Sequence, residues 1–502
     1  MIFILLKFSA QAVFRANAEN FFIRTCIFII AAVWYIQNAF TLKNKEFQIM
    51  GIVNIKWQTK EAAGKIRKLN GGNLAPCIAG EMAGRNIRKS FKELNLAFTR
   101  LHDAPLDNAN CPLVDIHCIF PLFHLDPNDS RNYCFKHTDD YLHNCIVDAE
   151  TPVFWRLGES IDHTINKYFI EPPADVDKWI DIASNIIRHY TEGLWDGFHY
   201  DIKYWEIWNE PECGGNTRLD PNAKNLMWLG TEDEFFAFFA KVAKELKKRF
   251  PHLKFGGPAH CGWSDFRSAP FLDKCAAEKV PLDFYSYHCY FNDPFGWILE
   301  TPGLARKKLD ELGYTETEIH LNEWHYFPGD WHRLRNDAVY KQNMYNNEMK
   351  GLDSAAALTT VMARWQDTPL DYGAYYTCTT SAWGCYVTGS NKPTPSYFGL
   401  KAFGDIVRYP ERTVAAADHE KVTVLAGKDA EGNMEMLVSA FNTGDNSFVI
   451  TLDKEIEPAK CQVLLLDENH NLSPCLEAVI TADTITFANE SNSAVALIKI
   501  AR

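Results

Sequence analysis

The sequence predicts an α/β fold, a (β/α)8 TIM barrel that is followed by a C-terminal antiparallel β-sandwich domain. Between residues 73 and 410, short apolar runs alternate with amphipathic stretches, which is typical of repeated βα units around a parallel sheet. From residue 411 the runs alternate apolar and polar residues and are separated by Gly, Asn and Asp, as in an antiparallel sandwich. A chain of 502 residues is also long enough for two or three domains.

The apolar runs of the first region number eight, which is the number of strands in such a barrel. The last of them could continue to Trp383. The predicted strands, in order, are Leu74–Ala79, Phe98–His102, Val153–Leu157, Tyr204–Glu210, Lys254–Pro258, Phe284–Tyr290, Ile319–Trp324 and Ala374–Thr379.

The helices between these strands are clearest at Glu232–Phe250. There Phe235 and Leu246 share one face, acidic residues come first and Lys and Arg come last, as the helix dipole favours. Trp179–Tyr190 and Ala338–Met349 show the same pattern. The sequence therefore supplies helices to cover the predicted barrel.

The sandwich domain is predicted to span residues 411–502. Residues 50–72 form a separate N-terminal segment that could pair with it, because Phe47–Gln58 reads as one or two strands. The predicted strands of the domain are Lys421–Ala426, Met434–Asn442, Ser447–Leu452, Gln462–Asp467, Thr484–Phe487 and Ala494–Ile500.

Residues 1–49 do not match the rest of the chain. The apolar run Thr25–Ile36 is short for a membrane span and suits the core of a signal peptide, but no clear cleavage site follows it. Three interpretations stay open: an upstream extension or mis-set start before Met50, a signal or membrane anchor, and a structural element. We expect a cytoplasmic protein, or a secreted or membrane-anchored one if the segment is genuine.

Composition excludes some classes of function. A formal net charge of -13 argues against nucleic acid as a partner, because phosphate binding needs clustered cations. The 14 cysteines include no C-x-x-C pair, so we expect scattered reduced thiols. Neither they nor His320, His325 and His332 show a metal-binding spacing, and no metal or cofactor is expected. A homo-oligomer is left open.

Two glutamates end predicted barrel strands. Glu210 closes the fourth strand within Trp208-Asn209-Glu210-Pro211, and the proline is expected to hold it in an extended conformation. Glu323 ends the seventh strand. The carboxyl ends of barrel strands converge on one face, where active sites form. Two carboxylates that flank one bond are the requirement for glycoside hydrolysis.

This arrangement resembles the clan of (β/α)8 retaining glycosidases, and within it glycoside hydrolase family 39, which includes β-xylosidases and α-L-iduronidases. The resemblance covers residues 70–410, and the trailing β-domain also fits. It implies that Glu210 is the acid/base, that Glu323 is the nucleophile and that Asn209 bonds the sugar 2-hydroxyl. The R-x-H formed by Arg100 and His102 would line the glycone subsite. Asn322, before the nucleophile, departs from the small hydroxyl residue expected there, which leaves the substrate open.

Three more residues are candidates for substrate binding. His288 and Tyr290, on the sixth strand, lie where the clan often places a residue that contacts the nucleophile. Trp383 could form a platform for the sugar. Glu206 is more simply a buried ion-pair partner of Arg100 or Arg156.

The two carboxyl groups need different environments. The acid needs a raised pKa, for which the neighbouring Tyr204, Trp205 and Trp208 could supply apolar surroundings. The nucleophile must stay ionised. Donors that could surround it are Arg100, His102, His288 and Tyr290.

The sequence therefore predicts an exo-acting retaining glycosidase, with β-xylosidase as the first candidate and xylosides or related plant or host glycans as substrates. An α-L-iduronidase or arabinosidase specificity is the alternative within the class, and a non-catalytic carbohydrate-binding barrel is the alternative outside it. Retention requires carboxyl groups roughly 5–5.5 Å apart, whereas roughly 6.5–9.5 Å indicates inversion.

Overall fold

The computed structural model describes residues 51–76, 86–103, 112–161, 168–214, 227–444 and 446–502. The described barrel and β-domain both lie in one compact unit, Ile52–Arg502. The predicted N-terminal extension and its apolar run lie outside the described residues. Within the ranges that are described, no helix is both long and apolar enough to cross a membrane.

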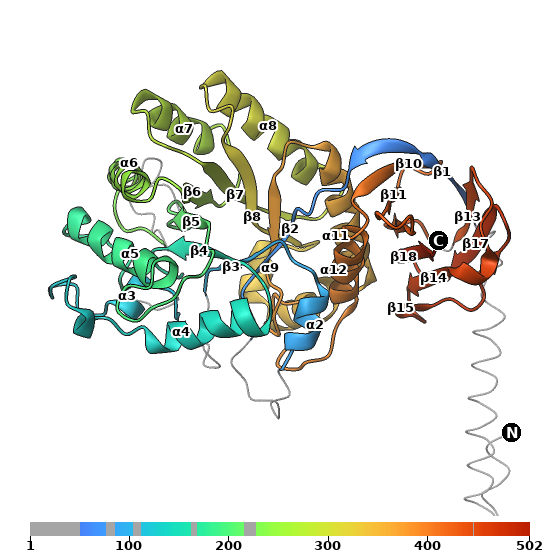
Figure 1. Cartoon of the computed structure of the whole chain (residues 1–502), viewed down its shortest axis with the longest axis horizontal. Helices are drawn as coiled ribbons and strands as arrows, with labels where there is room; N and C mark the ends of the chain where they lie inside the picture. The colour runs from blue at the N-terminus through green and yellow to red at the C-terminus, as the bar shows by residue number, and fades with distance from the viewer. Residues whose placement is uncertain (1–50, 77–85, 104–111, 162–167, 215–226, 445) are drawn as a thin grey trace, which may run out of the picture. The chain divides into compact units, whose positions relative to one another are not determined.

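Eight parallel strands close into a barrel, which confirms the predicted fold class (Figure 1). The fourth and seventh barrel strands, which were predicted to carry the two glutamates, are β5 and β8. The barrel strands are β2 (Asn70–Asn73), β3 (Thr99–Leu101), β4 (Val153–Leu157), β5 (Tyr204–Ile207), β6 (Lys254–His260), β7 (Phe284–Phe291), β8 (Glu318–Tyr326) and β9 (Tyr372–Tyr375).

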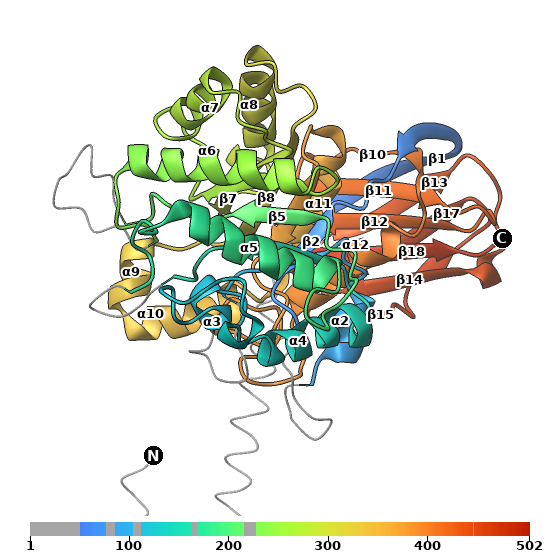
Figure 2. The same cartoon turned by 60° about the vertical axis from the view of Figure 1, so that its left-hand side comes forward.

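Helices cover the outside of the barrel, and α5 and α6 pack against each other beside β5 (Figure 2). The predicted helix at Glu232–Phe250 is confirmed as α6. It begins with a capping box, because Thr231 and Glu234 each accept a hydrogen bond from the other's backbone N–H. The helices are α2 (Arg88–Glu93), α3 (Ile116–Ile119), α4 (Lys136–His143), α5 (Val176–Thr191), α6 (Glu232–Arg249), α7 (Ser268–Ala277), α8 (Trp297–Glu311), α9 (Trp331–Asn336), α10 (Ala338–Asn343), α11 (Leu352–Arg364) and α12 (Pro395–Ile406).

The first barrel strand was predicted four residues too late. Its sequence is Asn-Gly-Gly-Asn, and glycine pairs usually mark turns. Here the glycines allow close packing: a Cβ at Gly71 would lie 2.9 Å from the ring of Phe98, and one at Gly72 would lie 2.7 Å from the Cys378 sulfur. The strand is therefore built around the side chains of its neighbours.

The last barrel strand ends earlier than predicted and does not run on to Trp383. After Tyr375, the N–H of Tyr376 still donates to the Trp324 carbonyl on β8. The N–H of the next residue, Thr377, donates to the carbonyl of Trp383 instead, so the chain folds back on itself. Trp383 consequently lies in a turn beyond the strand.

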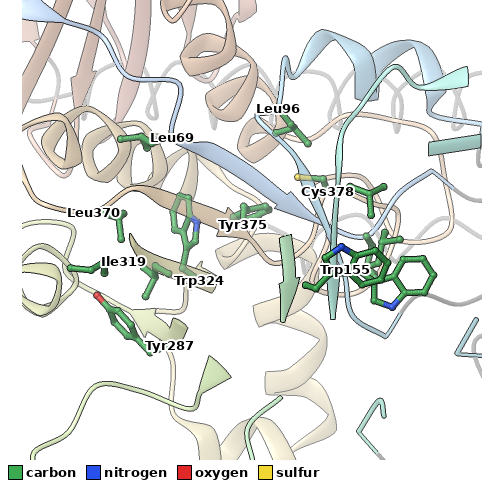
Figure 3. Packing of buried hydrophobic residues seen from close by; sticks show 14 of the residues in the cluster. Leu69, Leu96, Trp155, Tyr287, Ile319, Trp324, Leu370, Tyr375 and Cys378 are labelled. Carbon is green, nitrogen blue, oxygen red and sulfur yellow. The ribbon is translucent and has the colours of Figure 1, made fainter. Parts of the chain in front are cut away.

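Aromatic rings fill the amino-terminal end of the barrel. Phe98, Phe154, Tyr204 and Phe284 come from the starts of four strands and form one cluster. A larger cluster lies between strands and helices and includes Trp155, Tyr287, Ile319, Trp324 and Tyr375 (Figure 3). The cluster of four rings fills the amino-terminal end of the barrel, and ligand sites of such barrels form at the opposite end, where the strands have their carboxyl ends.

The C-terminal strands form one ten-stranded antiparallel sheet in the order β15-β14-β18-β12-β11-β10-β1-β13-β17-β16 (Figure 2). β1 precedes the barrel strands in the sequence and pairs with β10 in this sheet. The predicted strands of this domain are present, whereas β10, β15 and β16 were not predicted. The strands are β1 (Gly51–Lys65), β10 (Glu411–Ala417), β11 (Val422–Lys428), β12 (Met434–Ala440), β13 (Asn446–Leu452), β14 (Cys461–Leu466), β15 (Asn471–Pro474), β16 (Val479–Ile480), β17 (Thr484–Asn489) and β18 (Ala494–Ile500).

The sheet is fastened to the barrel by buried polar contacts with α11. Ser439 of β12 donates to the Ala356 carbonyl at 2.8 Å, and its hydroxyl also lies 2.7 Å from that of Thr359. Because these buried hydroxyl groups are paired, burying them adds no unsatisfied polar group. The sheet and the barrel therefore share one interface.

The tight packing at β2 gives a stability prediction. Gly72→Ala should lower the free energy of unfolding by about 1–3 kcal/mol, because the new methyl group would overlap the Cys378 sulfur and Leu96. Gly303→Ala in α8 is the matched control, since nothing lies within 4 Å of its Cβ position and alanine favours a helix. Thermal and urea unfolding measure both. Equal stability of the Gly72 variant and the unmodified protein would contradict this packing.

Candidate active site

Glu210 lies just beyond the end of β5, in a sharp turn. The expectation that Pro211 keeps it extended is wrong: φ is +41° at Glu210 and +74° at Trp208. The N–H of Glu210 donates to the carbonyl of Ala259 at the end of β6, at 2.9 Å, and this bond holds the turn. Left-handed backbone at a non-glycine residue costs of order 1–3 kcal/mol and is found most often at functional sites.

Glu323 lies within β8 and points toward the same end of the barrel. The Tyr290 hydroxyl donates a short hydrogen bond to its Oε1 atom. Its Oε2 atom lies 3.5 Å from Arg100 Nη1 and 3.7 Å from His288 Nδ1. The carboxylate is therefore surrounded by donors and positive charge, as a nucleophile requires.

His288 lies between the two glutamates. Its Nδ1 atom is 2.7 Å from Glu210 Oε1. One oxygen of each carboxylate and a nitrogen of this ring all lie within 4.8 Å of one another. In the β7–β8 ladder His288 is paired with Glu323, so the parallel register itself places the imidazole beside the second carboxylate.

The pKa shifts of Glu210 and Glu323 differ from the expectation that the pKa of the acid is raised and the nucleophile stays ionised. Burial raises the pKa of Glu210, but the hydrogen bond and charge of His288 outweigh burial and lower it. Burial also dominates at Glu323 and raises its pKa, with Glu210 adding and His288 and Arg100 opposing. Burial disfavours a charged His288, yet Glu323 and Glu210 raise the pKa of the ring. These directions favour a proton on His288 over one on Glu210.

The aromatic residues expected around Glu210 lie elsewhere. Tyr204 belongs to the cluster at the opposite end of the barrel. Trp205 stacks on Trp155, and the Trp208 indole donates to the Met227 carbonyl at 2.8 Å. The expectation was wrong because side chains alternate along a strand and Trp205 points outward, toward the helices.

Arg100 is fully buried and binds three groups at once. Its Nε donates to Glu206 at 2.7 Å, its Nη1 to Asn73 at 3.1 Å and its Nη2 to Asn209 Oδ1 at 2.6 Å. The expected ion pair with Glu206 is confirmed. Because Arg100 takes the amide oxygen of Asn209, it orients the Nδ2 end of that amide.

Asn322, the residue that departs from the family pattern, supports the same ion pair. Its amide donates a short hydrogen bond to Glu206 Oε1, and the Ser286 hydroxyl donates to the same oxygen at 2.7 Å. The backbone carbonyl of Asn322 accepts from Asn73 at 2.8 Å. The buried carboxylate of Glu206 is thus satisfied on both oxygens, which is what a buried charge needs.

His102 does not face Glu323 as expected. Its Nδ1 atom accepts from Arg156 Nε at 3.2 Å, and its Nε2 atom lies 3.4 Å from Asp103 Oδ2. Burial and the charges of Arg100 and Arg156 hold the pKa of His102 well below its usual value. It is therefore a neutral imidazole that lies between Arg156 and Asp103. Asp103 in turn accepts a hydrogen bond from the Tyr376 hydroxyl at 3.2 Å.

Trp383 stands in an aromatic wall beside Tyr290. The two ring centroids are 5.4 Å apart, and Trp331 lies 5.9 Å away at an interplanar angle of 25°. Tyr345 closes the group at 5.3 Å from Trp383. Trp331 is 40% exposed, so the wall presents an open aromatic face close to Glu323. Such a face suits stacking against a sugar ring.

Sequence reasoning did not identify several residues of this region. Asn73 was missed because the first strand was placed too late. Tyr376 was assigned to the interior of a strand that ends one residue before it. Cys213 and Cys261 come together from the turns after β5 and β6, and no motif links them. Only the correct register of the barrel strands would have shown these neighbours.

The fold is an eight-stranded parallel barrel with two glutamates close together at the carboxyl ends of its strands. Residues 83–298 match the sequence model of glycosyl hydrolases family 39. The chain is 33% identical over 181 residues to a β-xylosidase of Geobacillus stearothermophilus and 26% identical over 191 residues to one of Caldicellulosiruptor saccharolyticus. These matches cover 36% and 34% of this chain, and 29% and 36% of those relatives, about a third of their length.

Comparison of structures gives the same fold. A glucosidase from Croceicoccus marinus aligns with a TM-score of 0.71 and 20% identity over 90% of this chain and 99% of its own. CelM2, a bifunctional glucanase-xylanase from a metagenome library, aligns with a TM-score of 0.58 and 13% identity over 90% of this chain and 99% of its own. At these identities the likeness concerns the fold alone.

The buried ion pair beneath the site can be tested by removing one partner. Arg100→Ala should destabilise the protein by about 3–5 kcal/mol, because Glu206 would remain charged and buried without its partner. Lys241→Ala, which breaks an exposed pair with Asp177, is the control and should leave the unfolding midpoint nearly unchanged. Similar unfolding curves for both variants would contradict the structural role of Arg100.

Proposed function

We propose that this protein is a retaining glycoside hydrolase in which Glu323 is the nucleophile and Glu210 is the acid/base. The observation that carries the proposal is the distance between the carboxylates, since an oxygen of each lies within 4.8 Å of the other. This is compatible with the short separation of retaining enzymes, roughly 5–5.5 Å, and shorter than the roughly 6.5–9.5 Å of inverting enzymes. The paired carboxylates also disfavour a barrel that only binds carbohydrate.

In the first step, Glu323 attacks the anomeric carbon while Glu210 gives its proton to the leaving oxygen. A bond forms between a Glu323 oxygen and the sugar, and the glycosidic bond breaks. In the second step Glu210 takes a proton from water as the water oxygen bonds to the same carbon, and the ester to Glu323 breaks. Tyr290 and Arg100 hold the nucleophile in place through both steps.

The proton for the first step comes from the pair formed by His288 and Glu210. Moving it across their 2.7 Å hydrogen bond converts a charged ring and a carboxylate into a neutral ring and a carboxylic acid. When Glu323 becomes an ester it loses its negative charge, and the main support for a charged His288 disappears. The ring then stays neutral, and Glu210 is free to act as a base.

For the substrate we propose a β-xyloside cleaved from the end of a chain, in line with the names of the relatives. Asn209 would present its Nδ2 group to the sugar 2-hydroxyl, and Trp383 would stack against the sugar. A uronic acid, as in α-L-iduronidases, would need an unpaired cation. Among the described residues of the site, Arg100 and Arg156 are buried and already paired with carboxylates.

Cytoplasmic location and a homo-oligomer stay predictions.

The two proposed roles can be separated with azide. Glu210→Ala should slow hydrolysis of an aryl β-xyloside about 10²–10⁴-fold, because the general acid/base is lost. Added azide should restore turnover and give the β-glycosyl azide, since azide enters the space of the missing side chain and attacks the ester of Glu323.

Glu323→Ala is the matched variant. Azide should attack the substrate directly there and give the α-glycosyl azide. The products are distinguished by nuclear magnetic resonance. The same azide anomer from both variants, or unchanged activity in either, would refute the assignment of roles.

The position of the proton gives a pH prediction. His288→Gln should move the basic limb of the kcat/KM profile to lower pH, because Glu210 must then hold the acid proton without a group whose pKa is raised. The imidazole also contributes stability, which is complete below its unfolded pKa of about 6.5 and is lost as the pH rises through its raised folded pKa.

The melting temperature of the unmodified protein should therefore fall toward that of the His288→Gln variant over that range. Tyr314→Phe, distant from the site, is a control for general effects on titration. A basic limb that stays in place in the His288 variant would show that the acid proton does not depend on this ring.

A further inference from the structure

Two cysteines lie beside the proposed acid/base. The N–H of Cys213 donates to the Glu210 carbonyl at 2.9 Å, in the turn after β5. The N–H of Cys261 donates to Glu212 Oε1 at 2.8 Å, in the segment after β6. The two sulfur atoms and one carboxylate oxygen of Glu210 all lie within 4.8 Å of one another. Backbone hydrogen bonds therefore hold three ligand-type atoms in one cluster.

These atoms match the ligand preferences of thiophilic divalent cations. Zn²⁺ binds thiolate sulfur at about 2.3 Å and carboxylate oxygen at about 2.0 Å, so ligand atoms of a tetrahedral site lie roughly 3.5–3.8 Å apart. The present separations need to shrink by at most about 1.3 Å, within the reach of side-chain rotation. All three residues are partly exposed, which gives an ion access from solvent.

Three clusters of possible metal ligands occur among the described residues. The neighbouring charges make the cluster of Cys213, Cys261 and Glu210 the best suited of them to a cation. In the cluster of Asp115, His117 and Glu159, the carboxylate of Asp115 already accepts from Arg156. In the catalytic cluster, Glu323 lies 3.5 Å from the positive charge of Arg100. At the cysteine cluster, the ion pair that the described residues make with Glu210 is with His288, which uses Oε1. The other carboxylate oxygen of Glu210, Oε2, can therefore bind a metal ion.

We propose that Cys213, Cys261 and Glu210 form a binding site for one thiophilic divalent cation of the Zn²⁺ type, and that occupation of this site inhibits the enzyme. On binding, each thiol releases a proton to solvent and no electrons are transferred. The metal takes a lone pair of Glu210, so this residue can neither hold a proton for the leaving group nor accept one from water. Binding is independent of the proposed function, whereas inhibition rests on it.

No metal was expected from the sequence because the cysteines show no metal-binding spacing. That reasoning applies to ligands that come from one short motif. Here the ligands come from the ends of two neighbouring barrel strands, which the parallel sheet brings side by side. The fourth position of a tetrahedral site would be left for water, as in sites with three protein ligands.

Direct binding is the first test. The full-length protein is freed of metal with a chelator, dialysed against Zn²⁺ and analysed for bound metal per chain. Cys213→Ser and Cys261→Ser should each bind one Zn²⁺ fewer than the unmodified protein, whereas Cys134→Ser, which changes an exposed cysteine, should bind the same number. Equal zinc content in all four proteins would overturn the proposal.

A spectrum of the unmodified protein makes the result independent of how the variants fold. Co²⁺ replaces Zn²⁺ in tetrahedral sites and gives a thiolate-to-metal charge-transfer band when sulfur is a ligand. We expect this band to rise with Co²⁺ and to be removed by Zn²⁺ competition. Absence of the band in the unmodified protein would also overturn the proposal.

Turnover is the second test. Saturating Zn²⁺ should slow hydrolysis of an aryl β-xyloside by about 10²-fold or more, the contribution expected of a general acid/base. A chelator should restore the rate. In Cys213→Ser and Cys261→Ser, each compared with its own metal-free rate, the inhibition should be lost.

The outcomes are distinguishable. If no glycoside is turned over, the proposed function fails while the binding test still stands. If zinc binds through these cysteines and turnover continues unchanged, the inhibitory part of the proposal is refuted.

Discussion

The proposed active site depends on one imidazole, His288, that lies between two carboxylates. With an oxygen of each within 4.8 Å, two unshielded carboxylates would repel by at least about 3 kcal/mol at an effective dielectric constant of about 20. His288, 2.7 Å from one and 3.7 Å from the other, offsets this repulsion with its charge. In the proposed mechanism the same ring also supplies the proton for Glu210.

Beneath this group lies a second layer of paired charges. Arg100 is fully buried, and its guanidinium bonds Glu206, Asn73 and Asn209. A buried ion pair is tolerated only when its remaining donors and acceptors are satisfied, and here Asn322 and Ser286 complete the carboxylate. The layer therefore fixes Asn209 from below and adds positive charge near Glu323. The departure of Asn322 from the family pattern has a structural reason, because its amide bonds the Glu206 carboxylate.

The sequence was sufficient to predict the barrel, the added β-domain and the convergence of Glu210 and Glu323. The alternation of apolar runs with amphipathic stretches locates the barrel strands, and the carboxyl ends of those strands converge on one face of the barrel. The sequence was insufficient wherever conformation depends on neighbours distant in sequence. The first strand was predicted too late because Asn70–Asn73 has no apolar side chain, and its glycines pack against side chains such as the ring of Phe98. The surroundings of Glu210 were misjudged because residues adjacent in sequence, such as Trp205, point outward, while its real neighbour, His288, comes from another strand.

The stereochemistry of the first product distinguishes two displacements at the anomeric carbon from one. Hydrolysis of an aryl β-xyloside can be followed by proton nuclear magnetic resonance before the sugar mutarotates. We expect the β-anomer of the free sugar to form first, because two displacements at the anomeric carbon restore its configuration. Initial formation of the α-anomer would mean a single displacement by water, and would contradict the roles assigned to Glu323 and Glu210.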